Sequence, residues 1–454
     1  MNRKILSLAI PNIVSNITIP LLGMVDMAIV GHLGDDALIG GIGIGTSVFN
    51  FIYWNFAFLR MGTSGLTAQS YGARNFPEIM AVLVRALSVS LLAAVLLILF
   101  REPVGRLAFR MMDGTPHTMG YAAEYFYARI WAAPATVSLF AFQGWFIGMQ
   151  NSRIPMYIAI TQNVVNIIAS LGLVYLCGMK VEGVALGTLI AQYAGFLMGI
   201  VLWMHNYGRL KRFWEIKNYK LKIKGGEGAG IWEKGAMFRF FQVNRDIFLR
   251  TLCLVAVTLF FTSAGASQGE IILAVNTLLM QLFTLFSYVM DGLAYAGEAL
   301  SGRYIGARNR EAFTDTVRHL FGWGAVIAVL FTLVYALGGN AFLGLLTDDK
   351  EVIAVADTYF YWALAVPAVG IAAFIWDGIF IGATATRGML LSMAAAAVSF
   401  FILYYGLHPV LANHALWLAF LTYLLMRGVV QTGLSREVIR RGFPSKKEPA
   451  WREG

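Results

Sequence analysis

The run VLVRALSVSLLAAVLLILF, residues 82–100, decides the class of fold, because it is apolar over its whole length and contains a single charged residue, Arg85. A bilayer core of about 30 Å needs about 20 helical residues at about 1.5 Å each. Eleven further runs of this kind give twelve expected spans, so the sequence predicts an all-α integral membrane protein. The spans cover residues 5–30, 38–59, 82–100, 122–149, 154–177, 184–203, 236–263, 271–299, 320–337, 352–381, 389–407 and 412–425.

The composition of the 454 residues supports the same class, since charged residues make up 13 % and hydrophobic residues 58 %. Soluble domains carry roughly 25 % charge, and half of that does not cover a soluble surface of this size. Cys177 and Cys253 lie in separate apolar runs, and the six histidines show no HExxH pattern. We therefore expect no disulfide framework, metal centre or cofactor. A membrane enzyme is the least expected class, because no nucleophile, base and orienting group fall at a recognisable spacing.

The Lys and Arg residues predict the orientation. Twelve spans put both termini on one side, and the basic cluster between Arg209 and Lys234 lies on that side. The opposite loops hold only five basic residues, Arg101, Arg106, Arg110, Lys180 and Lys350. Basic residues accumulate in cytoplasmic loops, so we expect both termini in the cytoplasm of a bacterial inner membrane. The net charge of +10 is spread over the inner loops, which argues against a nucleic-acid partner.

The sequence also divides into two related halves. Residues 72–75, Gly-Ala-Arg-Asn, recur as residues 306–309, and 143–148, QGWFIG, correspond to 377–382, DGIFIG, each pair 234 residues apart. We expect two six-helix lobes, 1–205 and 236–432, related by pseudo-two-fold symmetry. We expect a basic linker, 206–235, to join the lobes and to touch anionic lipid. A cytoplasmic tail, 433–454, is expected to follow. Parallel repeats of this kind are typical of carriers that alternate access around a site between the lobes.

Several motifs together resemble the MATE (multidrug and toxic compound extrusion) family, and within it the DinF-like branch. They are Pro11 with Met24-Val25-Asp26 and Val30–Gly34 in the first span, YGARN after the second, Asp291–Ala294 with Glu298 in the eighth, and DGIFIG before Arg387. The resemblance covers nearly the whole chain. It implies a monomeric secondary antiporter that exports cationic or amphipathic small molecules in exchange for inward H⁺ or Na⁺, without an ATPase motor.

Asp26 is the first candidate for ion coupling, because an acid inside an apolar helix is costly and is functional by default. Asn166 and Ser170 lie four residues apart on one helix face, and Thr188 reaches a similar depth in the next span. The resemblance implies an ion site at Asp26, Asn166 and Thr188, but Ser170 stands where the family has a second acid. Losing a carboxylate disfavours Na⁺, so we expect H⁺. The alternative is that these polar side chains only bond the helices together.

Other candidates are weaker. The resemblance links Pro11 to bending of the first helix, although plain helix irregularity is an equal alternative. Asp291 and Glu298, seven residues apart, could form one acidic wall of a central cavity that attracts cations. Asp291 and Asp377 could take part in binding substrate or a proton, or could instead pair with Arg245 or Arg250. Asp246 could pair with Arg250 at i,i+4. Tyr53 and Phe286 are the aromatic candidates for binding organic cations.

Two rival carrier functions remain open. A lipid-linked saccharide flippase of similar architecture would want a basic cavity for pyrophosphate, which Arg239, Arg245 and Arg250 could supply. A facilitator of the other large twelve-helix superfamily would carry an acidic residue followed by two arginines between the second and third spans. This chain has YGARN there.

Overall fold

The computed structural model describes residues 1–31, 36–110, 112, 114–210, 232–347 and 349–444. Within them, twelve helices are long and apolar enough to cross a membrane, which confirms the twelve predicted spans. The first six are built from α1 Asn2–Gly31, α2 Asp36–Trp54, α3 Ala57–Gly72, α4 Phe76–Leu99, α6 Pro116–Arg129, α7 Ala133–Gly148, α8 Arg153–Leu171 and α9 Val181–Tyr207. The other six are α11 Lys234–Ala266, α12 Glu270–Gly306, α13 Arg310–Leu346, α14 Lys350–Gly382, α15 Thr386–Leu411 and α16 Asn413–Gly442.

The structure extends several expected spans. The second continues through a turn at Asn55 and Phe56 into α3, so that Arg60, which the sequence placed in a loop, is a buried helical residue. The last span continues as α16 to Gly442, seventeen residues past the expected end at 425. The residues after 425 are more polar, so the apolar run ends there although the helix continues. A short helix, α5 Arg101–Arg110, occupies an expected loop. Most of the expected linker and the end of the tail, residues 211–231 and 445–454, lie outside the described residues.

The chain forms two compact units whose limits differ from the expected lobes. The N-terminal unit is Val14–Phe241, and the C-terminal unit is Met1–Ile13 with the chain from Gln242 onward. The boundary falls within α1 because the start of that helix packs directly on α12: a Cβ added to Gly292 would lie 2.3 Å from an Ile13 side-chain carbon. It falls within α11 because Phe240 packs with Leu66, Val82, Ala86 and Ala141 of the N-terminal unit.

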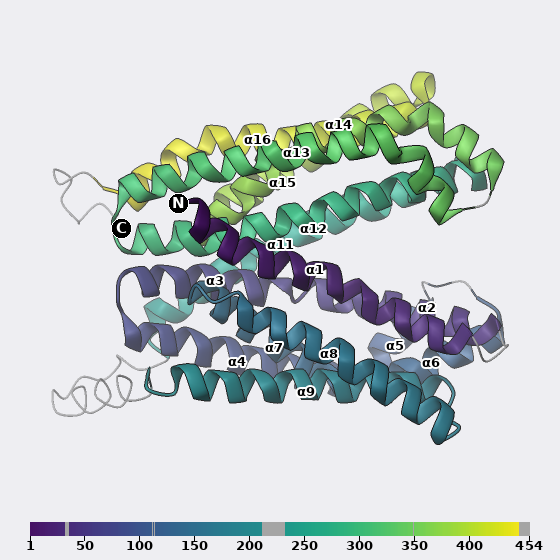
Figure 1. Cartoon of the computed structure of the whole chain (residues 1–454), viewed down its shortest axis with the longest axis horizontal. Coiled ribbons are helices and arrows are strands. Elements are labelled where there is room, and N and C mark those ends of the chain that lie inside the picture. Colours follow the sequence, from purple (N-terminus) through teal and green to yellow (C-terminus); the bar gives the residue numbers. More distant parts are fainter. Residues whose placement is uncertain (32–35, 111, 113, 211–231, 348, 445–454) are drawn as a thin grey trace. The chain divides into compact units, whose positions relative to one another are not determined.

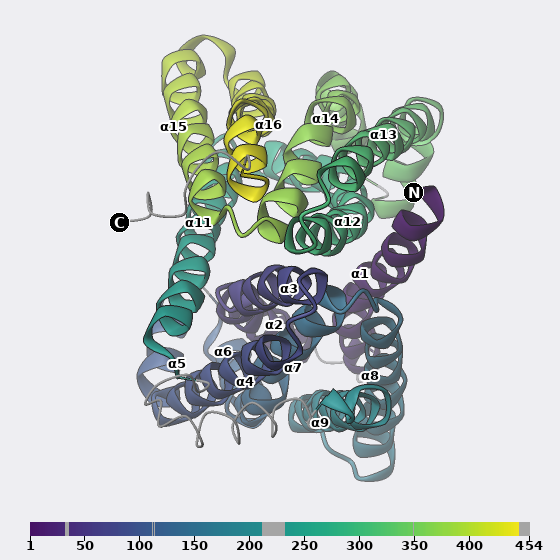
Figure 2. The same cartoon turned by 90° about the vertical axis from the view of Figure 1, so that its left-hand side faces the viewer.

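Each unit is built around one central helix. In the C-terminal unit α14 packs against α12, α13 and α16, and in the N-terminal unit α7 packs against α3, α4 and α9. Figure 2 shows α14 end-on among its neighbours. Gly144 of α7 and Gly378 of α14 allow a neighbouring backbone to approach closely, since added Cβ atoms would lie 2.1 Å from the Arg60 carbonyl oxygen and 2.2 Å from that of Ala294. These pairs keep the offset of 234 residues, so the repeat in the sequence is a repeat in packing.

The turns that follow these helices are repeated too. Arg74 and Arg308 both adopt a positive φ, of 55° and 52°, at the end of α3 and of α12. The next residue then caps the following helix: Asn75 Oδ1 accepts from the Glu78 amide at 3.3 Å, and Asn309 Oδ1 from the Ala312 amide at 2.9 Å. A side-chain acceptor at this position satisfies an otherwise unpaired helix N–H. The GARN motif is therefore a helix stop followed by a helix start.

Both ends of the described chain lie at the same end of the C-terminal unit. The Trp323 indole donates to Asn2 Oδ1 at 3.1 Å, which places the start of α1 beside α13. The Phe443 ring lies 5.4 Å from that of Phe313, which places the end of α16 at the start of α13. An even number of spans requires this arrangement.

Candidate functional site

The four polar residues expected to converge in the N-terminal unit do meet, around Asp26. Thr188 Oγ1 donates to Asp26 Oδ2 at 3.0 Å, with the Val184 carbonyl as its alternative acceptor at 3.2 Å. Asn166 Nδ2 donates to Thr188 Oγ1 at 3.1 Å and more weakly to Ser170 Oγ at 3.4 Å. All four side chains are buried, and Asp26 Oδ1 accepts no hydrogen bond from any described residue. The cluster is a relay of donors that ends on one oxygen of a buried carboxyl group.

Arg129 of α6 is the member of this site that the sequence analysis missed. Its guanidinium is buried and exerts an electrostatic attraction on Asp26. Nη1 donates to the Tyr125 hydroxyl at 2.6 Å, and the guanidinium carbon lies 4.8 Å from the centre of the Phe49 ring. A signal was available, because an arginine inside an apolar span is as costly as an aspartate there and points to a partner of opposite charge.

The aromatic candidates lie in packed interiors. Tyr53 stacks on Phe49 at 5.5 Å, so it belongs to the aromatic group that surrounds Arg129. Arg129, the protein's own cation, thus lies against Phe49 and Tyr125, two other rings of the group that contains Tyr53. Phe286 is 0 % exposed and packs edge-on against Phe331 and Phe374, which makes it a core residue in this structure.

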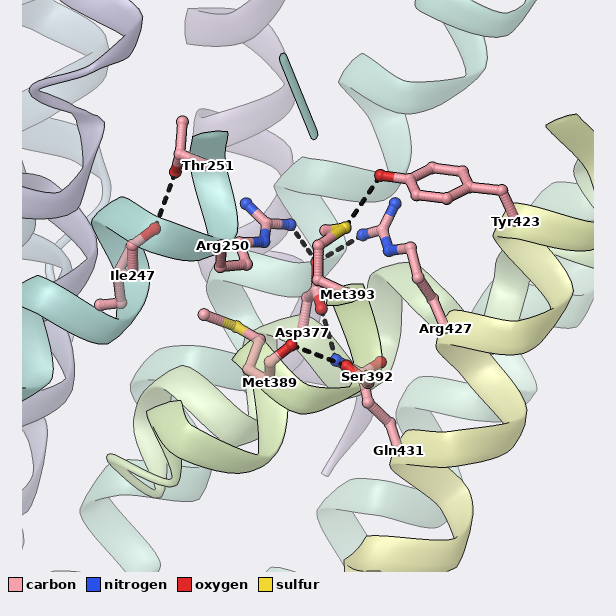
Figure 3. Close-up of polar contacts among 10 residues, drawn as sticks. All are labelled: Ile247, Arg250, Thr251, Asp377, Met389, Ser392, Met393, Tyr423, Arg427 and Gln431. Carbon is pink, nitrogen blue, oxygen red and sulfur yellow. Dashed lines mark hydrogen bonds and ion pairs between the residues drawn. The ribbon is translucent and has the colours of Figure 1, made fainter. Parts of the chain in front are cut away.

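The C-terminal unit contains a second buried carboxyl group, and this one is saturated with donors. Asp377 of α14 forms ion pairs with Arg250 of α11 and with Arg427 of α16, whose Nη2 lies 2.5 Å from Oδ2. Gln431 Nε2 donates to the other carboxylate oxygen at 2.6 Å. Figure 3 shows Asp377 between the two guanidinium groups. The expected alternative of pairing with Arg250 is therefore present, and Arg427, which lies just past the expected end of the last span at 425, is an additional partner.

The expected i,i+4 pair of Asp246 and Arg250 is wrong. Asp246 instead pairs with Arg245 at 2.9 Å and accepts from Thr386 Oγ1 at 3.1 Å. An i,i+4 pair on a helix surface contributes only about 0.2–0.5 kcal/mol, so a buried carboxylate on another helix, Asp377, determines where Arg250 points.

Asp291 and Glu298, the expected acidic wall of a central cavity, differ in burial. Glu298 is fully buried, next to the close contact between α12 and α14, whereas Asp291 is half-buried and acts electrostatically on Arg427. Seven residues place both on one side of α12, but burial separates their environments.

Pro11 is a buried residue inside α1, two residues before the boundary between the units at Ile13 and Val14. The helix is continuous from Asn2 to Gly31. Bending at Pro11 therefore stays a prediction.

Among the residues that the structure describes, no three His, Cys, Asp or Glu side chains gather at one point.

Comparison with known proteins places this geometry in a family. The MatE family model matches residues 11–171 and 247–406, one segment in each half of the chain. The chain belongs to the MATE family. It is 37 % identical to DNA damage-inducible protein F of Escherichia coli over 441 residues, which are 97 % of this chain and 93 % of that protein. This similarity confirms the DinF-like branch that the motifs indicated.

More distant MATE relatives agree. The chain is 21 % identical to the probable multidrug resistance protein NorM of Thermotoga maritima over 78 % of this chain and 74 % of that protein. A crystal structure of a MATE protein in a bent conformation shares the fold with a TM-score of 0.84, at 19 % identity, over 97 % of this chain and 96 % of that one. The protein is thus a multi-pass membrane transporter and not an enzyme.

Proposed function

We propose that this MATE protein is a proton-coupled antiporter that exports cationic or amphipathic small molecules, with Asp26 as the proton site. The observation that supports this proposal is that the Asp26 carboxyl group is buried and has few donors: Oδ2 accepts a hydrogen bond from Thr188, and Oδ1 accepts none from the residues that the structure describes. A buried carboxyl group with so few donors is costly to hold as an anion, and a proton removes that cost. Loading and release of H⁺ at Asp26 would then switch the unit between two arrangements.

The geometry favours H⁺ over Na⁺ at this site. A hard cation needs several converging oxygen ligands, as in other oxygen-lined cation sites. Here Asn166 presents its amide nitrogen to Thr188, and Thr188 directs its proton at Asp26. The positive charge of Arg129 acts on the same carboxyl group and would repel a second cation. Asn166, Thr188 and Ser170 are therefore proposed to orient Asp26 and not to bind sodium.

The flippase alternative loses its support in this structure. Arg245 and Arg250 are each paired with an aspartate, and Arg239 Nη2 donates to Gln69 Oε1 at 2.8 Å. No pair of them is left to hold a pyrophosphate together. We propose instead a monomeric exporter in the bacterial inner membrane, with both termini in the cytoplasm as the distribution of Lys and Arg indicates.

The test is efflux of a cationic dye from proteoliposomes under separately imposed H⁺ and Na⁺ gradients. A proton gradient alone should drive transport in the wild type, and Asp26→Asn should reduce it to the level of empty liposomes while keeping the wild-type elution profile. Glu124→Gln, an acid on α6, is the matched control and should transport normally. Proton-driven efflux by Asp26→Asn, or efflux that needs Na⁺, would refute the proposal.

A further inference from the structure

Helix α5, Arg101–Arg110, carries an unexplained concentration of positive charge. It follows three membrane crossings, so it lies on the side opposite Met1. Three of the five basic residues assigned to that side, Arg101, Arg106 and Arg110, belong to this one helix. Because basic residues are normally scarce on that side of a membrane protein, their clustering needs a reason other than topology.

One side of α5 is fixed to the rest of the N-terminal unit. A Cβ added to Gly105 would lie 3.1 Å from the Phe126 ring and 3.2 Å from the Tyr127 hydroxyl, so α5 contacts α6 closely there. The Tyr127 hydroxyl also donates to Glu102 Oε2 at 3.1 Å. Figure 1 shows α5 beside α6, at the end of the unit away from the turn between α3 and α4. The helix is therefore a docked element with a defined outer side.

The outer side of α5 lines a hollow of about 410 Å³ formed by Pro103, Arg106, Leu107 and Arg110. Arg106 and Arg110 lie four residues apart, as do Pro103 and Leu107, so a basic strip and an apolar strip run side by side. Arg106 is paired only weakly, because its side chain is 73 % exposed and Nη2 lies 4.0 Å from Glu102 Oε2, and Arg110 forms no ion pair with a described residue. Their charge is thus available to a ligand.

The hollow lies next to surface suited to lipid. Leu99 and Phe100, immediately before α5, are 69 % and 57 % exposed. The Arg101 guanidinium lies 5.2 Å from the centre of the Trp131 ring, which is itself half-exposed. Tryptophan and exposed apolar residues next to arginine are characteristic of the boundary between acyl chains and headgroups.

We propose that this hollow binds an anionic phospholipid. The lipid phosphate lies between Arg106 and Arg110, and the start of an acyl chain lies against Pro103 and Leu107. Two arginines and no acid among the lining residues exclude an organic cation by charge. Leu107 is exposed beside these arginines, so the hollow suits a ligand that has an apolar chain as well as a negative charge. A free anion has no apolar part to place against Leu107. The site is separate from Asp26, so the proposal does not depend on the coupling ion.

The experiment compares lipid binding by the full chain in detergent, using native mass spectrometry with dioleoyl phosphatidylglycerol and dioleoyl phosphatidylcholine. The wild type should retain phosphatidylglycerol preferentially. A basic residue near an anionic lipid is worth about 1 kcal/mol, so Arg106→Gln with Arg110→Gln should weaken this binding about 30-fold. The matched control, Lys180→Gln with Lys350→Gln, removes the same charge from the same side and should bind as the wild type does.

Two further arms separate the source of the phosphate and guard against misfolding. Short-chain phosphatidylglycerol should raise the thermal-unfolding midpoint of the wild type, whereas the same concentration of inorganic phosphate should not. Arg106→Lys with Arg110→Lys should keep most of the preference for anionic lipid. Equal phosphatidylglycerol binding by the double Gln variant, equal loss in the Lys180 and Lys350 control, or an equal shift with inorganic phosphate would each overturn the proposal.

Discussion

Asp26 and Asp377 are both buried aspartates inside apolar helices, yet their surroundings differ in the property that matters for transport. Asp377 accepts from two arginines and a glutamine. Among the described residues, Thr188 donates to one oxygen of Asp26 and no donor reaches the other. A carboxylate whose charge is fully compensated gains little from a proton, whereas one with few donors gains much. Two acids of similar burial therefore suit opposite tasks: Asp377 links three helices through its ion pairs, and Asp26 has the surroundings that suit the proton site proposed above.

Asp26 and Asp377 can be compared position by position because the two units repeat the same close contacts between helices. The close contact of Gly144 with Arg60 recurs as that of Gly378 with Ala294. At the same offset of 234 residues, the counterpart of Asp26 is Phe260, and that of Asp377 is Gln143. Phe260 packs among aromatic rings of α15. Packing has thus been kept in both halves, while the buried aspartate of each half lies at a position where the other half has an uncharged residue.

The largest expected effect on stability comes from Asp377→Asn. It leaves the buried guanidinium groups of Arg250 and Arg427 without their counter-ion, and breaking a buried pair costs about 3–5 kcal/mol in the free energy of unfolding. Thermal unfolding in detergent should show a markedly lower midpoint than for the wild type. Asp26→Asn should lower it far less, since no ion pair is broken.

A second substitution checks that charge causes this loss. In Asp377→Asn with Arg427→Gln, one of the two stranded charges is gone, so part of the lost stability should return, as a double-mutant cycle would show. If Asp377→Asn unfolds at the wild-type temperature, the proposed division between a structural and a coupling acid is wrong.

The sequence identified the acidic residue of each site, Asp26 and Asp377, but not the arginines Arg129 and Arg427 that act on them. Asp26, Asn166 and Thr188 could be brought together because their depths in three apolar spans are similar. Arg427 could not be placed, because hydropathy ended the last span at 425 while α16 continues to Gly442. Hydropathy reports where lipid contact ends, not where a helix ends, so a charge beyond that point is assigned to solvent.

The pairing errors have a related cause. Periodicity along one helix identified Asp246 and Arg250 as neighbours, yet their partners lie on other helices or beside them in the chain. Contacts between helices depend on helix rotation and crossing, which one sequence does not specify. The repeat was the exception, because packing glycines such as Gly144 and Gly378 leave a signature at a fixed offset.

Arg129→Gln tests the other aspartate of the comparison, since the positive charge of Arg129 acts on Asp26. Removing it makes the anionic form of Asp26 less favourable, so a proton should bind at lower concentration. The pH of half-maximal proton-driven efflux should therefore rise by about one unit, as expected for loss of a nearby opposite charge. Arg129→Lys should stay close to the wild type. An unchanged pH profile in Arg129→Gln would show that Arg129 has only a packing role against Phe49 and Tyr125.

The smallest effect is expected at Ser170, where the sequence departs from the family pattern. Its hydroxyl accepts only a long bond from Asn166, at 3.4 Å, and does not contact Asp26. Ser170→Ala should change the efflux rate by no more than about twofold, because a weak neutral hydrogen bond is worth about 0.5 kcal/mol. Thr188→Val, which is nearly isosteric and removes the donor to Asp26, should cost about tenfold or more under the same proton gradient. Equal losses in the two variants would mean that the cluster affects transport through its packing as a whole. The hydrogen bonds from Asn166 through Thr188 would then not control proton binding at Asp26.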